Sequence, residues 1–96
     1  MRSLHRDRSI VVVLGLDSSE AEAESNYWRG LGALVVRTRD AGGCLRLATS
    51  VGPDVIVLDR RVSGRLVQLL RAHPVSSSAR IEWLPSPDPA NEYRAA

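Results

Sequence analysis

The stretch "GPDVIVLDRR" at residues 52–61 decides the fold of this chain. A Gly-Pro pair breaks the preceding pattern, and "DVIVL" is a short apolar run rich in β-branched side chains. Such a run is typical of a strand buried on both faces of a parallel sheet. Asp59 ends the run, and Arg60 and Arg61 follow it. The stretch therefore predicts a central strand with a carboxylate at its carboxyl end.

Strand and helix patterns alternate on both sides of this stretch. Strands are predicted at residues 9–16 ("SIVVVLGL"), 33–39 ("ALVVRTR"), 54–58 ("DVIVL") and 80–84 ("RIEWL"). Helices are predicted between them, from a cap near Asp17 to Gly32, from a cap at Asp40 to Val51, and from Ser63 and Gly64 to about His73. This order predicts a three-layer α/β/α domain with a flavodoxin-like parallel sheet of about four strands. Right-handed crossovers give the strand order 2-1-3-4.

Length and composition fit a single small domain. The chain has 96 residues, of which 44% are apolar and 25% are charged, as in ordinary globular proteins. We expect a basic N-terminal arm at residues 1–8, the α/β domain at residues 9–84, and a proline-rich tail at residues 85–96. No stretch resembles a signal peptide or a membrane span. The single cysteine, Cys44, excludes an internal disulfide and favours a cytoplasmic location.

The charged residues limit the chemistry and the partners. All 13 basic residues are arginine, so no mechanism that needs a lysine ammonium can run within this chain. The net charge of +2 is modest, and only the arm "MRSLHRDR" is strongly basic. Because no helix-turn-helix signature accompanies this arm, nucleic acid is not an expected partner.

Two aspartates are predicted to meet at one edge of the sheet. In a doubly wound parallel sheet, ligands bind at the carboxyl ends of the central strands. Asp17 follows the first strand and Asp59 ends the third. Asp59 is either a reactive carboxylate or a strand-end residue in a solvated ion pair with a neighbouring arginine. Asp17 is placed either to cap the next helix or to help hold a metal ion.

The residues "PDVIVLD", after the segment "LGALVVRTRDAGGCLRLA", resemble the receiver domain of two-component response regulators. The resemblance covers about residues 10–84. It implies that Asp59 corresponds to the phospho-acceptor, with Mg²⁺ as cofactor and a histidine kinase or an output protein as partner. Asp17 and Asp59 are then the candidate metal ligands, and Arg60 and Arg61 the candidate phosphate contacts.

The sequence departs from the receiver pattern at several positions. The acidic pair of that family falls at about Gly15 and Leu16, and the hydroxyl residue of its fourth strand falls at about Pro85 or Ser86. The family's lysine is missing, and no sequence remains after the fourth strand for its last helices and strand. We therefore interpret the chain as an atypical, C-terminally shortened receiver with a degraded acidic pocket.

Three functions remain open at this point. The first is a protein–protein interaction module, without catalysis, for which phosphorylation is dispensable. Its interface candidates are Trp83 and Trp28, each of which also suits a core, and it is predicted to form a homodimer through the shortened edge of the sheet. The second is a phospho-accepting receiver that uses Asp59 with a non-standard metal site. The third is a small flavodoxin-like module that binds a phosphate or nucleotide over Gly15.

Overall fold

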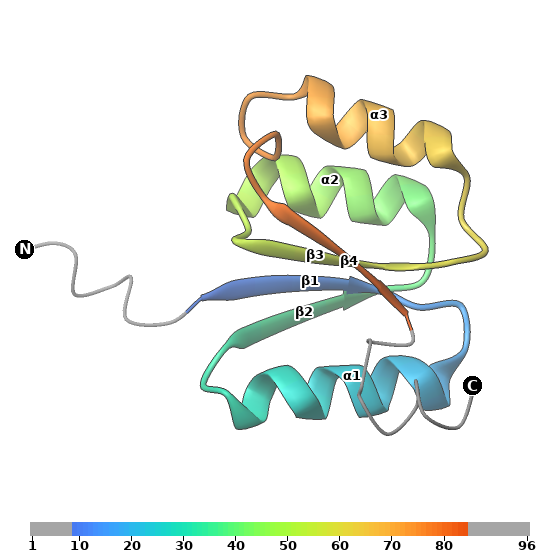
Figure 1. The fold of residues 1–96 in the computed structure, drawn as a ribbon, viewed down its shortest axis with the longest axis vertical. Coiled ribbons are helices and arrows are strands. Elements are labelled where there is room, and N and C mark those ends of the chain that lie inside the picture. The colour runs from blue at the N-terminus through green and yellow to red at the C-terminus, as the bar shows by residue number, and fades with distance from the viewer. Residues whose placement is uncertain (1–8, 85–96) are drawn as a thin grey trace, which may run out of the picture.

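The computed structural model describes residues 9–84 of the chain. The predicted arm at residues 1–8 and tail at residues 85–96 lie outside the described residues, and so do Pro85 and Ser86. The elements are β1 (Ile10–Leu14), α1 (Ser18–Gly30), β2 (Leu34–Thr38), α2 (Ala41–Val51), β3 (Val55–Asp59), α3 (Gly64–Ala72) and β4 (Arg80–Leu84) (Figure 1). Every strand and helix predicted from the sequence is present in this order.

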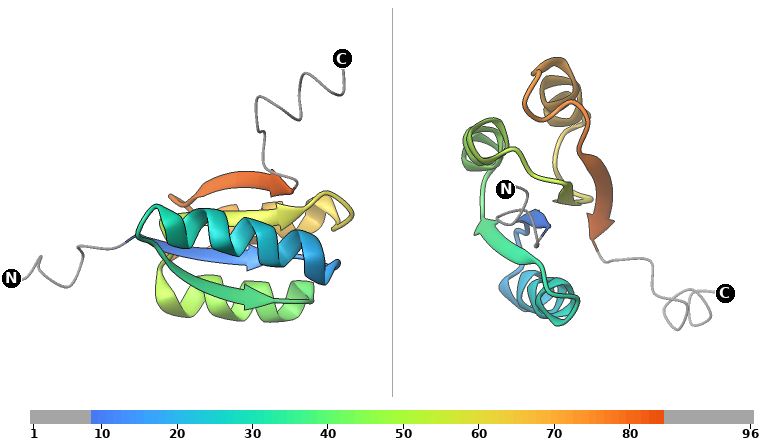
Figure 2. Two further views of the ribbon diagram at one scale, coloured as in Figure 1. Left: turned by 90° about the horizontal axis from the view of Figure 1, so that it is seen from below. Right: turned by 90° about the vertical axis from the view of Figure 1, so that its left-hand side faces the viewer.

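The four strands form one parallel sheet in the order β2-β1-β3-β4. Helix α1 covers one face, while α2 and α3 lie on the other (Figure 2). The fold is therefore a flavodoxin-like α/β/α sandwich, and both the predicted class and the predicted strand order are confirmed. β1 and β3 are the two central strands, with Leu14 opposite Leu58 in the register.

Strand β3 forms the middle of the core because side chains on both of its faces are covered. All five of its residues are buried, Asp59 included. One apolar cluster lies between the sheet and the helices α2 and α3, and it contains Val12, Leu14, Cys44, Ala48, Ile56, Leu58, Leu66, Leu70 and Ala79. The second lies on the α1 face and contains Val11, Val13, Ala21, Trp28, Ala33, Val55, Val57 and Leu84. The alternation of a strand between two faces explains why successive β3 residues belong to different clusters.

Each helix begins at a polar residue whose side chain accepts a backbone N–H. Asp17 accepts from Glu20, Asp40 from Gly43, and Ser63 from Arg65. These caps satisfy backbone donors that the first helical turn leaves without an intrahelical partner.

The ends of the first two helices differ in how closely they follow the sequence prediction. Helix α2 ends at Gly52, whose φ of 65° is a left-handed conformation that favours glycine. Helix α1 ends at Gly30, two residues before the predicted end, and Gly32 adopts a φ of 91° in the turn that follows.

Trp28, a candidate interface anchor, lies in the core cluster on the α1 face. Its side chain is only 9% exposed, and its Nε1–H donates to Glu24 Oε2 at 2.7 Å. Trp28 is therefore a core residue, and its hydrogen bond satisfies the buried carboxylate of Glu24. Trp83, by contrast, is 36% exposed on β4. Of the two tryptophans, only Trp83 lies on the surface.

Cys44 is fully buried in α2. Burial, and to a lesser degree the nearby Asp40, raises the pKa of the Cys44 thiol to about 11. The thiol therefore behaves as a small apolar side chain. Among residues 9–84, no helix is long and apolar enough to cross a bilayer.

Candidate functional site

The candidate site lies at the carboxyl edge of the sheet, where β1 and β3 end side by side. The backbone N–H of Leu16, just beyond β1, donates to Asp59 Oδ2 at 3.0 Å. The chain then turns tightly after β3, because the N–H of Val62 donates to the carbonyl of Asp59 at 3.1 Å. The two strand ends are thus joined through one carboxylate. The strand order predicted that these ends lie at one edge of the sheet, but it did not predict this hydrogen bond.

The carboxylate of Asp59 accepts four hydrogen bonds. Besides the bond from Leu16, the backbone N–H of Arg61 donates to Oδ1 at 3.0 Å. The guanidinium of Arg61 then closes on both oxygens, with Nε to Oδ1 at 2.8 Å and Nη2 to Oδ2 at 2.8 Å. A carboxylate offers about four lone-pair positions in all. Each oxygen of Asp59 therefore already accepts two donors, and the Arg61 contact is a bidentate fork.

The Asp59 carboxylate is buried although its partner is not. The side chain of Asp59 is 2% exposed, whereas that of Arg61 is 57% exposed. Hydrogen bonding from the Arg61 side chain holds the pKa of Asp59 well below its usual range, and the backbone N–H groups of Arg61 and Leu16 add to this effect. Burial acts in the opposite direction and is outweighed. The predicted ion pair with a neighbouring arginine is therefore present, but its Asp59 half is buried rather than solvated.

Arg61 is held from a second side by α1. Its Nη2 contacts Glu20 Oε1 at 3.2 Å. The pKa of Arg61 is raised, chiefly by the hydrogen bond to Asp59, with smaller contributions from the charges of Glu20 and Asp17. Glu20 was not predicted as a site residue from the sequence. Its position gives a signal, however, because the first turn of a helix that follows a central strand lies near this edge of the sheet. The Arg61 guanidinium thus contacts two carboxylates, those of Asp59 and Glu20.

The two arginines after Asp59 have different surroundings. Arg61 folds back over the strand end, whereas Arg60 is exposed. No hydrogen bond or ion pair of the Arg60 side chain is found within residues 9–84. Of the two predicted phosphate contacts, only Arg61 is brought to Asp59, and there it occupies the oxygens that a phosphoryl group would need.

The donor set does not fit a Mg²⁺ ion. Mg²⁺ requires oxygen ligands in near-octahedral array, commonly one or two carboxylates with free lone pairs. In this structure the Asp59 oxygens are filled, and Asp17 Oδ1 accepts the N–H of Glu20 at 3.0 Å to cap α1. Within the part of the chain that the structure describes, no group of three or more His, Cys, Asp or Glu side chains is arranged to hold a metal. Asp17 therefore acts as a helix cap here.

The space next to Gly15 is filled by protein atoms. A Cβ added there would lie 2.7 Å from the Cβ of Ala21 and 3.3 Å from a methyl carbon of Leu84. The glycine thus allows α1 and β4 to approach the end of β1 closely. The side on which a Cβ would project offers no room for a phosphate or nucleotide.

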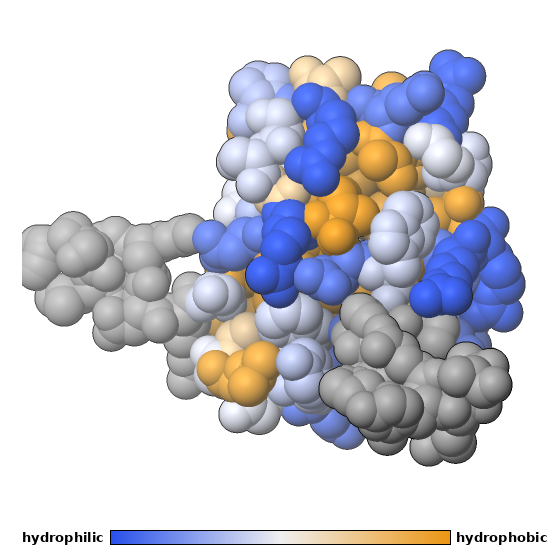
Figure 3. Space-filling model, in the orientation of Figure 1, coloured by the Kyte–Doolittle hydropathy of each residue, from blue (hydrophilic) through white to orange (hydrophobic). Residues whose placement is uncertain are grey.

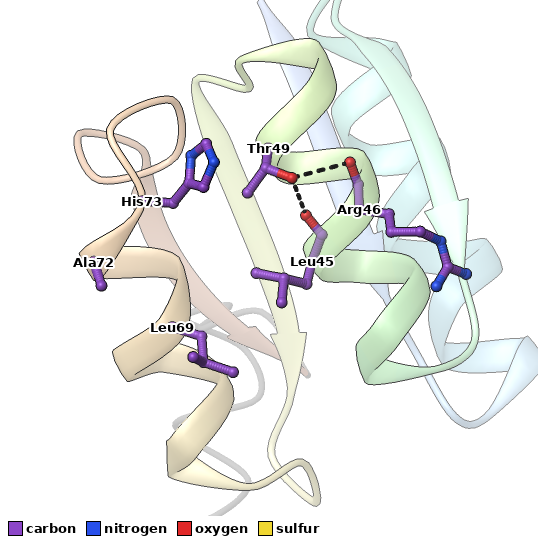
Figure 4. Close-up of a pocket in the computed structure, with 6 residues that line it drawn as sticks. All are labelled: Leu45, Arg46, Thr49, Leu69, Ala72 and His73. Carbon is purple, nitrogen blue, oxygen red and sulfur yellow. Dashed lines mark hydrogen bonds between the residues drawn. The ribbon is translucent and has the colours of Figure 1, made fainter.

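A groove lies between α2 and α3. It has a volume of about 370 Å³ and is lined by Leu45, Arg46, Thr49, Leu69, Ala72 and His73 (Figure 4). The hydroxyl of Thr49 bonds back to its own helix, to the carbonyls of Leu45 at 2.7 Å and Arg46 at 3.3 Å. In Figure 4 the Arg46 side chain points away from the groove. Because few polar groups converge in it, the groove does not define a ligand.

Comparison with known proteins supports the fold. The sequence matches no protein-family model and no curated protein at a significant level. Among solved structures, a similar fold is found in a protein described as a "putative response regulator" from Chloroflexus aurantiacus J-10-fl. The TM-score is 0.71 at 22% sequence identity, and the match covers 80% of this chain and 66% of that one, so this chain spans just under two thirds of the neighbour's length. The chain therefore has a response-regulator-like fold.

Proposed function

We propose that this domain is an atypical receiver that works by binding another protein rather than by phosphoryl transfer. The observation that carries the proposal is the Arg61 fork on Asp59. A carboxylate that accepts a phosphoryl group must direct a free oxygen lone pair at phosphorus while the bond from the donor breaks. In Asp59 both oxygens are already bonded, and the side chain is only 2% exposed.

The electrostatics of the site support the same proposal. Arg61 gives Asp59 the neutralising charge that a metal ion gives an open acidic pocket, but a guanidinium does not order attacking and leaving oxygens as Mg²⁺ does. The chain contains no lysine to assist. The partner class suggested by the fold is a histidine kinase or an output protein, and such partners imply a cytoplasmic location.

A second candidate function is phospho-acceptance at Asp59, and two observations favour it. The lowered pKa keeps the carboxylate ionised, as a nucleophile requires, and Arg61 is 57% exposed, so its side chain has room to turn away. In that case the guanidinium would leave Asp59 and contact the incoming phosphoryl oxygens. Glu20, which holds Arg61 from α1, opposes this movement.

Intact mass after incubation with acetyl phosphate and Mg²⁺ tests the proposal. We expect the wild-type mass to stay unchanged over a period in which a receiver with an accessible acceptor is labelled in a parallel reaction. The Asp59→Asn variant is the matched control for labelling elsewhere in the chain. A gain of one phosphoryl mass in the wild type that is absent from Asp59→Asn would overturn the proposal. Labelling that appears only in Arg61→Ala would identify the guanidinium as the group that blocks the reaction.

A further inference from the structure

Strand β4 is an outer strand of the sheet formed by residues 9–84. The backbone N–H of Arg80 donates to the carbonyl of Asp54, so this residue directs its backbone toward β3. Because successive strand residues alternate, Ile81 and Trp83 direct their N–H and C=O groups away from β3. An edge of this kind is a template for pairing with another strand.

The side chains of Ile81 and Trp83 form an apolar surface on the same edge. In the register Ile81 lies opposite Ile56 and Trp83 opposite Leu58, which places both on the sheet face that carries α3. Figure 3 views the molecule from the β4 side and shows apolar surface between α3 and this strand. Ile81 is half-buried and Trp83 is 36% exposed. Within residues 9–84, this edge thus combines apolar side chains with backbone groups that no neighbouring strand pairs.

The charges on β4 indicate what pairs with it. Arg80 and Glu82 lie on the opposite face, two residues apart, and form an ion pair of 2.7 Å with exposures of 64% and 23%. In an antiparallel pair of identical strands centred on Ile81, Arg80 of each copy lies opposite Glu82 of the other. Opposite charges directly across an antiparallel pair are stabilising, and like charges are destabilising. The strand is therefore complementary to itself.

Other registers and the other edge are less suitable. A pairing centred on Glu82 would place two glutamates opposite each other, and one centred on Trp83 would place Glu82 opposite Leu84, so neither register pairs opposite charges. Strand β2, at the other side of the sheet, carries Arg37 as its only charged residue, so two copies of it offer no opposite-charge pair.

The geometry points to a second copy of this chain as the occupant of the β4 edge. Two β4 strands pair antiparallel about a two-fold axis at Ile81, which joins the two sheets through the backbone groups of the two Ile81 residues. Trp83 lies on the same face as Ile81, opposite Ala79 of the other copy, whose N–H and C=O are already bonded to Ser76 and Arg71. Such an interface is isologous, as expected of a symmetric dimer. The inference deepens the proposed function by naming a binding partner, and it rests on that proposal only in treating the domain as a binding module.

Charge reversal at β4 tests this dimer. We expect the wild-type 96-residue chain to show a concentration-dependent monomer–dimer equilibrium in sedimentation velocity. Arg80→Glu and Glu82→Arg each create two like-charge pairs across the interface, so each variant should dimerise at least about tenfold more weakly. Glu22→Arg is the matched control, because Glu22 forms an ion pair of 2.7 Å with Arg37 near the other edge. Its dimerisation should equal that of the wild type.

Mixing the two single variants separates this interface from effects within one strand. At positions 80 and 82, one variant then carries two glutamates and the other two arginines. The mixture should therefore form heterodimers more strongly than either variant forms homodimers. An ion pair within one copy cannot produce that result. A wild-type chain that remains monomeric at all concentrations, or a mixture that stays monomeric, would overturn the inference and leave the edge to another occupant such as residues 85–96. Phosphorylation of Asp59 would contradict the proposed function without changing this outcome.

Discussion

Asp59→Ala is expected to lower the free energy of unfolding by about 3 kcal/mol at neutral pH. The substitution removes the acceptor of four hydrogen bonds and leaves the backbone N–H groups of Leu16 and Arg61 without a partner at the strand end. An unsatisfied buried donor costs about 1–3 kcal/mol, whereas the exposed part of the guanidinium can turn to water. Chemical denaturation of both proteins measures the difference.

Asp17→Ala is the matched control for this loss, because its carboxylate makes one exposed hydrogen bond, as a helix cap. We expect it to cost about 1 kcal/mol. The Asp59 contribution also depends on pH: the folded-state pKa is lowered, so the stabilisation is complete above the unfolded pKa and is lost as the pH falls through the folded value. Equal losses in the two variants, or a wild-type advantage that is already lost where an ordinary aspartate titrates, would contradict the four-bond geometry.

Leu58→Ala is expected to lower the free energy of unfolding by about 2–5 kcal/mol. Leu58 is fully buried in the central strand and packs in the cluster beneath α2 and α3. Truncation leaves a cavity that the strands on both sides prevent from closing. Because domains of this size have about 5–15 kcal/mol of stability in total, the variant would approach unfolding at physiological temperature.

Leu69→Ala tests whether this loss depends on burial rather than on the substitution itself. Leu69 is 43% exposed on α3, beside the groove between α2 and α3. We expect its replacement to cost no more than about 1 kcal/mol. Thermal or denaturant unfolding of both variants provides the comparison, and a loss for Leu69→Ala as large as that for Leu58→Ala would argue against the assigned core.

The architecture could be predicted from the sequence because local patterns and the global fold agree. The apolar run before Asp59 is typical of a strand with both faces covered. The capping aspartates and the glycine after α2 mark where helices begin and end. The strand order followed from the handedness of parallel crossovers. The position of Asp59 beside the end of β1 also followed from the strand order, because it depends on which strands are neighbours.

The chemistry of the site could not be predicted in the same way. Two arginines follow Asp59, and which of them folds back depends on the tight turn at Arg61 and on Glu20, which is 41 residues earlier in the chain. Likewise, the sequence places Glu24 among the acidic residues near a helix start, but the hydrogen bond from Trp28 makes it a buried core residue. Such pairings depend on three-dimensional neighbours.

The most direct test of this account is an NMR titration of the Asp59 carboxyl carbon. Chain labelled with ¹³C at the aspartate side chains would be titrated in acid, and the resonance assigned by its absence in Asp59→Asn. An unperturbed aspartate titrates near about 3.9. With Arg61 closed on both oxygens, we predict that Asp59 stays ionised well below that range, and that Arg61→Ala moves its pKa back toward the ordinary value. An Asp59 that titrates like an exposed aspartate in the wild type would contradict the closed site.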